Sequence, residues 1–189
     1  MRIDKIITAI ITTSLIGFSS TCFALAYWSD LKIGEVYYEQ TVDDLVSKYG
    51  KPLREDWETT DYDGVVRYGY YVQDTVLWIN IEDGVVTGAA AVNVKRKKSK
   101  LMTSEGIGFG ATIEDVINVY GTPDSDKMVQ IVGKKELRLE YHTSKIEIND
   151  LQSPYKAMLG KLRFFFKNNK VDTITFLYDY DRRDSGNTK

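Results

Sequence analysis

Few residues in this 189-residue chain have the types and spacing needed for catalysis or metal binding. Asp61 and Asp63, followed by Gly64, match the start of a calcium loop, but the later acidic ligand that such a loop needs is missing. A solvated hairpin turn is therefore the preferred interpretation, with calcium as the alternative. His142 is the only histidine, so a catalytic triad would depend on it and a zinc site lacks ligands. The sequence predicts no enzyme activity, no metal and no cofactor.

Two further stretches have compositions that can bind anions. Gly106, Gly108 and Gly110 precede an expected helix N-terminus, where backbone N–H groups can cradle a phosphate. Their spacing is not that of a dinucleotide-binding loop, so phosphate is the weaker interpretation. A basic run follows the first set of strands and is expected to be a solvated linker, with contact to an anionic lipid or cell-wall polymer as the alternative. The basic residues of this run are Lys95, Arg96, Lys97, Lys98 and Lys100.

The elements that would position such residues are organised around a stretch that occurs at 41–52 and again 71 residues later, at 112–123. Thr, Asp, Tyr, Gly and Pro recur at identical positions, which indicates an internal duplication. Each copy predicts a short amphipathic helix, at 41–49 and 112–120, with Thr as N-cap and Gly-x-Pro as the stop signal. Helices this short need packing against another element to persist.

Alternating apolar residues and turn signals predict the strands. The first unit has strands at 65–73, 76–82 and 85–94, with Asp83-Gly84 as a two-residue hairpin turn. The second unit has strands at 127–132, 135–142, 160–167 and 170–178, and its extra residues are expected in an irregular stretch at 143–159. The predicted fold is α+β, with two tandem helix-plus-β-meander repeats and an antiparallel sheet whose short helices pack on one face.

The expected organisation is a signal peptide at 1–26, repeat 1 at 27–94, a basic linker at 95–104, repeat 2 at 105–178 and a charged tail at 179–189. Residues 1–26 have a charged start, an apolar run from Ile6 to Phe18 and an A-x-A cleavage pattern at Ala24-Leu25-Ala26. An uncleaved anchor is the weaker interpretation because the run is shorter than the roughly 20 residues of a bilayer span. Lipid attachment at Cys22 is a further alternative.

Cleavage at this site predicts an exported bacterial protein of the periplasm, cell envelope or extracellular space, without a membrane span. The segment removes two basic residues, one acidic residue and the only cysteine, so the net charge changes from −2 to −3 and no disulfide can form. Such a charge is not that of a nucleic-acid-binding protein.

Strand alternation predicts which face of the sheet is buried. Leu77, Ile79 and Ile81 point one way, as do the apolar residues at 137, 139, 141, 162, 164 and 166. The opposite face, called here the open face, mixes arginine with aromatic residues, which are enriched where proteins bind proteins. The alternative is that these are ordinary surface residues and that Trp78 packs under 143–159. The candidate partner-binding residues are Arg67, Tyr71, Trp78, Arg138, Arg163 and Phe165.

The order of capped helix, Gly-x-Pro, aromatic strand and hairpin resembles the repeat of the beta-lactamase inhibitor protein and that of the small outer-membrane lipoproteins of the SmpA/OmlA type. The resemblance covers 41–52 with 77–86, and 112–123 with 162–174. It implies a helix layer on an antiparallel sheet and, from the inhibitors, a concave sheet face that grips a partner. The repeat disulfides of the inhibitors and the lipobox of the lipoproteins are absent here.

Three functions are consistent with these features. The leading hypothesis is an exported, non-enzymatic and inhibitor-like module that binds another protein with its open sheet face. The second is an envelope assembly or cell-wall scaffold factor that contacts an anionic envelope component through the basic run. The third, a carboxylate-dependent enzyme, is disfavoured because no pair of Asp or Glu residues is singled out.

Overall fold

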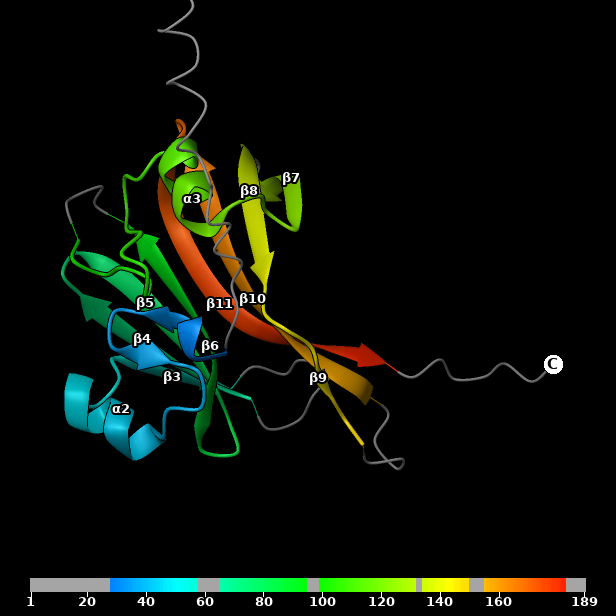
Figure 1. Ribbon diagram of the computed structural model, residues 1–189. Helices are drawn as coiled ribbons and strands as arrows, with labels where there is room; N and C mark the ends of the chain where they lie inside the picture. Colours follow the sequence, from blue (N-terminus) through cyan, green and yellow to red (C-terminus); the bar gives the residue numbers. More distant parts are fainter. Residues whose placement is uncertain (1–27, 58–64, 95–98, 132–133, 150–154, 183–189) are drawn as a thin grey trace, which may run out of the picture.

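The computed structural model describes residues 28–57, 65–94, 99–131, 134–149 and 155–182 (Figure 1). Several sequence predictions lie outside the described residues: the signal peptide at 1–26 with Cys22, the calcium candidates Asp61 and Asp63, and the basic residues Lys95, Arg96, Lys97 and Lys98. Within the described ranges, no helix is long and apolar enough to cross a membrane.

Most of the described chain forms one antiparallel sheet of nine strands. Their order is β3-β4-β5-β6-β11-β10-β8-β7, and β9 pairs with β10. The strands are β3 (Arg54–Trp57), β4 (Val66–Val72), β5 (Thr75–Glu82), β6 (Val85–Asn93), β7 (Ser125–Ile131), β8 (Lys134–His142), β9 (Ile146–Glu147), β10 (Tyr155–Lys167) and β11 (Lys170–Arg182). The first and second halves of the chain share this sheet because β6 pairs directly with β11, through Gly88–Val92 and Thr173–Leu177.

Both copies of the duplicated stretch form a capped helix, as predicted. The α-helices are α2 (Val42–Tyr49) and α3 (Ile113–Tyr120), and the Thr41 and Thr112 hydroxyls accept from the backbone N–H three residues on. The reciprocal bond, from the backbone N–H of the cap to the carboxylate three residues on, completes a capping box at Thr112. Gly50 and Gly121 end the helices with positive φ values of 77° and 75°, which glycine adopts without strain.

A tyrosine on a sheet strand bonds to the C-terminal end of each helix. The hydroxyl of Tyr70 on β4 donates to the carbonyl of Gly50 at 3.3 Å, and that of Tyr141 on β8 donates to the carbonyl of Gly121 at 3.2 Å. The donors and the acceptors are both 71 residues apart in sequence, like the duplicated stretches. The same contact therefore fixes both helices.

The predicted α+β class, with two tandem helix-plus-β-meander repeats whose short helices pack as a layer on one face, is wrong. The fold is predominantly β, and its two α-helices in the described part of the chain bury only Leu45, Val116 and Tyr120. A helix of eight residues is ~12 Å long, whereas eight strands side by side span ~34 Å. Two such helices are too short to cover this sheet.

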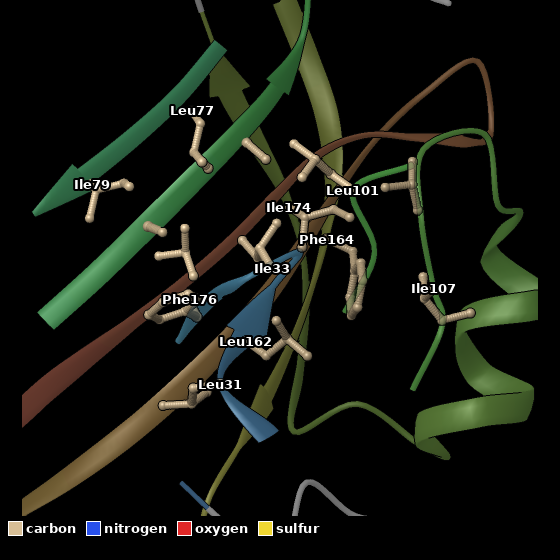
Figure 2. Packing of buried hydrophobic residues seen from close by; sticks show 14 of the residues in the cluster. Leu31, Ile33, Leu77, Ile79, Leu101, Ile107, Leu162, Phe164, Ile174 and Phe176 are labelled. Carbon is tan, nitrogen blue, oxygen red and sulfur yellow. The ribbon is translucent and has the colours of Figure 1, made fainter. Parts of the chain in front are cut away.

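A short hairpin region and the chain before α3 cover the core face instead (Figure 2). A 3-10 turn (Trp28–Asp30) leads into a two-stranded hairpin of β1 (Lys32–Ile33) and β2 (Val36–Tyr37). This hairpin region and the chain before α3 supply residues to the same buried cluster as the sheet residues Leu162 and Phe164. These contributed residues are Leu31, Ile33, Val36, Leu101 and Ile107. The core is therefore completed by segments in which the sequence shows no helix or strand periodicity.

The predicted buried face is the buried one: Leu77, Ile79 and Leu162 are 0% exposed. The Asp83-Gly84 turn is also present, with φ values of 51° and 78°. The stretch at 143–159, expected to be irregular, instead contains β9 and the start of β10. β11 likewise runs to Arg182, into the expected tail, because β10 and β11 pair along 13-residue strands.

Candidate functional site

A groove on the open face of the sheet brings together four of the six candidate residues. Arg67, Trp78, Arg163 and Phe165 line it, and its volume is about 310 Å³. The other lining residues are Asn80, Ala89, Ala90, Thr175, Phe176 and Leu177. The groove therefore unites β4 and β5 of the first half with β10 of the second half.

The groove exists because small side chains lie between large ones. At its centre, Ala90 on β6 pairs with Thr175 on β11. On one side Trp78 on β5 pairs with Ala90, and on the other side Arg163 on β10 pairs with Thr175. Three strand spacings place the β5 and β10 walls ~14 Å apart along the sheet. That width admits one extended segment or loop of a partner.

Trp78 is held in place by Gly69 and Arg54. Gly69 on β4 pairs with Trp78. A Cβ atom at this glycine would lie 2.8 Å from the indole ring and would clash with it. The Arg54 guanidinium lies 5.5 Å from the centre of the indole ring, which is a cation–π distance. The indole therefore lies over the glycine, and its position is fixed before any partner arrives.

Changing Gly69 to alanine is expected to displace the Trp78 indole and to cost about 1 kcal/mol of folding free energy, as overpacking does. The measurement is a ¹H–¹⁵N spectrum, in which the Trp78 indole N–H resonance should shift. Trp28 serves as an internal control because its ring is not among the nearest neighbours of the added methyl group. An unmoved Trp78 resonance would contradict the packing described.

The two arginines of the groove are oriented by different partners. Arg67 Nε donates to Asn80 Oδ1 at 3.1 Å. Arg163 Nε donates to Glu140 Oε2 at 2.5 Å, across the β10–β8 pair. Asn80 and Glu140 are thus supporting residues that the sequence analysis missed. Only the strand register, which sequence does not reveal, places Glu140 opposite Arg163.

Glu140 is the centre of a charge cluster beside the groove. Its side chain is 7% exposed and also lies 2.8 Å from His142 Nε2, 3.6 Å from Arg138 Nη2 and 4.0 Å from Lys161 Nζ. Burial by itself would raise the pKa of this carboxyl, but hydrogen bonds from His142 and Arg163 and the charges of Arg163 and Lys161 outweigh it. They lower the pKa of Glu140 to about 2, so it is ionised at neutral pH. The only histidine is engaged here with Glu140.

The remaining candidates lie outside the groove. Tyr71 is 44% exposed and donates its hydroxyl to Asp74 Oδ1 at 3.0 Å. Arg138 pairs with Phe165 across β8 and β10 and joins the Glu140 cluster. Of the basic run, Lys100 is described, and its backbone N–H donates to Gln73 Oε1 at 2.9 Å. Within the described ranges, no three Asp, Glu, His or Cys side chains gather as a metal site requires.

Comparison with known proteins shows distant similarity to solved structures alone. No family model matches the chain, and no curated protein matches it by sequence. An extracellular protein containing an SCP domain from Bacillus anthracis aligns with a TM-score of 0.45 and 12% identity, over 77% of this chain and 49% of that one. A cysteine-rich secretory protein from Staphylococcus aureus aligns with a TM-score of 0.44 and 16% identity, over 85% and 55%. This chain thus spans about half the length of each.

A third structure is that of a protein from Streptococcus mutans named as a candidate beta-lactamase inhibitor protein. It aligns with a TM-score of 0.30 and 12% identity, over 77% of this chain and 83% of that one. The resemblance to the beta-lactamase inhibitor protein that the sequence suggested thus has one weak structural match. The resemblance to the SmpA/OmlA type stays a prediction. Similarities this distant assign neither a family nor a function to the chain.

Proposed function

We propose that this chain is an exported, non-enzymatic module that binds another protein through the groove on its open sheet face. The observation that carries the proposal is the gathering of Trp78, Phe165, Arg67 and Arg163 around one groove, from strands of both halves of the chain. Tryptophan and arginine are the residue types that most often dominate the energy of protein interfaces. Export rests on the pattern of residues 1–26.

Preorganisation of the groove supports binding. Trp78 lies over Gly69, and the two arginines are held by Asn80 and Glu140. Ordering a flexible side chain at an interface costs about 0.5–1.5 kcal/mol. Side chains that are already held lose less entropy when a partner docks, so more of the contact energy appears as affinity.

Replacing both Trp78 and Phe165 by alanine is expected to abolish capture of the partner while leaving the fold intact, because the aromatic area of the groove is lost. The measurement is a pull-down from envelope and culture-supernatant fractions with the chain from Tyr27 onward, quantified by mass spectrometry. Circular dichroism and thermal unfolding check that the variant is folded.

The matched control replaces Tyr71 by alanine. Tyr71 is an exposed aromatic residue on β4 that does not line the groove. A protein captured by the parent and by Tyr71→Ala, but not by the double variant, would support the proposal and name the partner. Equal capture by all three forms would refute binding through the groove.

A further inference from the structure

The large sheet ends on two edges of different character. β3 at one edge has four residues, whereas β7 at the other edge has seven and pairs with β8 along its whole length without a bulge (Figure 1). Proteins usually protect an exposed edge with short strands, bulges, prolines or covering segments, because an open edge pairs with other strands. β7 contains no proline, and its Met128 is 61% exposed. β7 is therefore the less protected edge of this sheet.

The outward backbone of β7 has no partner in the part of the chain that the structure describes. In an antiparallel ladder, alternate residues of an edge strand direct their N–H and C=O groups away from the neighbouring strand. Among the described residues, the backbone of 125–131 makes no hydrogen bond other than those to β8. The edge thus has the hydrogen-bonding geometry to add one more strand.

The charged side chains next to this edge also lack opposite charges to pair with. Asp126 and Lys127 lie on β7, and Lys135 and Glu136 lie near the start of β8. Within the described ranges, none of these four side chains forms an ion pair. Lys127 instead lies opposite Arg138 across the β7–β8 pair, which is a like charge. An added strand can therefore supply the opposite charges that are missing here.

A second copy of β7 fits this edge in a register centred on Met128. In a two-fold symmetric antiparallel pair, one residue of the strand faces its own copy. Asp126 or Lys127 in that position would place like charges opposite each other, which is destabilising. Met128 is the middle residue of β7, so a pair centred on it aligns all seven residues of both strands. The exposed Met128 side chains then meet at the centre, each beside Leu137 of its own chain.

This register brings opposite charges towards each other across the contact. Lys127 lies opposite Val129 of the second copy, and Val129 pairs with Glu136 on β8. Lys127 and Glu136 of the second copy are thus two strand spacings apart, ~10 Å between their Cα atoms, a distance that the two long side chains bridge. On the other face of the sheet, Asp126 and Lys135 are related in the same way. The strand is therefore complementary in charge to a second copy of itself.

We propose that β7 pairs with β7 of a second copy of this chain, antiparallel about Met128, and so joins two sheets into one symmetric dimer. The contact consists of strands ~24 Å long and the side chains beside them. This is small for a stable complex, so the dimer is expected to dissociate in the micromolar range. β7 does not line the groove, so the dimer leaves the groove free.

Analytical ultracentrifugation of the chain from Tyr27 onward, which contains every residue that the structure describes, measures this association from micromolar to millimolar concentrations. The sedimenting mass is expected to rise from that of a monomer to that of a dimer. Hydrogen exchange at both ends of this range should show slower exchange for the amides of 125–131 in the dimer and unchanged exchange for those of β3. A monomer at all concentrations, or a dimer without protection of β7, would overturn the inference.

Charge reversal on both sides of the contact tests the register. Lys127→Glu and Glu136→Lys each place like charges across the interface twice, since the dimer is symmetric. Each variant is expected to weaken self-association at least about fivefold. A mixture of the two variants restores both opposite-charge contacts and is expected to form a heterodimer about as tightly as the parent forms its dimer. Lys51→Glu is the control, because Lys51 is an exposed cation after α2, and it should leave the association within about twofold.

Recovery in the mixture separates a lost contact from a lost fold, because two misfolded variants cannot restore each other. A mixture that associates no better than either variant alone would contradict this register. A chain that stays monomeric, and whose β7 amides become protected only when a protein captured in the pull-down is added, would assign the edge to a foreign strand and overturn self-pairing. The Trp78→Ala, Phe165→Ala variant tests the groove separately and should dimerise like the parent.

Discussion

Replacing Phe164 by alanine is expected to lower the free energy of unfolding by about 4 kcal/mol, as buried Phe-to-Ala changes do. Phe164 on β10 is 0% exposed. Its ring centre lies 5.4 Å from that of Tyr120 and 6.1 Å from that of Tyr141, so it joins α3 to β8. Removal of the ring leaves a cavity and breaks both aromatic contacts. Urea unfolding monitored by circular dichroism measures the loss.

The neighbouring residue is the matched control. Phe165→Ala removes the same atoms from the same strand, but Phe165 points to the groove on the open face. Since part of its ring is already in contact with water, we expect a loss of about 1 kcal/mol. Equal losses for the two variants would contradict the assignment of the two faces.

Replacing Glu140 by glutamine is expected to cost about 2 kcal/mol at neutral pH. The change leaves Arg163, Arg138 and Lys161 without the carboxylate that they share, and breaking a buried ion pair is costly because the remaining charges lose their compensation. The loss is smaller than at a fully buried site because these cationic side chains are 14–21% exposed. Urea unfolding of both forms at pH 7 gives the difference.

The cost of Glu140→Gln is also expected to depend on pH. The folded pKa of about 2 lies below the ordinary value of 4.5, so the ionised carboxylate stabilises the folded state above pH 4.5. This stabilisation is lost as the pH falls from 4.5 toward 2. The difference between parent and variant should therefore be full above about pH 5 and shrink below it. Glu136→Gln, on the same face of β8, is the control, and a pH-independent difference for Glu140→Gln would contradict the cluster.

The features that sequence predicted correctly depend on residues close together in the chain. A threonine cap and the residue three positions on, or the period of two along a strand, are local relations. Thr41, Thr112 and the Asp83-Gly84 turn were therefore found, and so was the buried face that includes Leu77 and Leu162. Alternation alone also placed Trp78 and Phe165 on the open face.

The features that sequence did not predict depend on residues far apart. Leu31 and Ile33 cover the core in place of a helix layer. No helix or strand periodicity in the sequence predicts this. The pairing of β6 with β11 sets the walls of the groove, and a slip of one residue in register would turn every side chain to the other face. Arg163 and Glu140 meet across 23 positions of sequence for the same reason. Local patterns in this chain specify its helices, turns and strand faces. The groove arises only where distant strands pair, because register and strand order are set by the packing of the whole sheet.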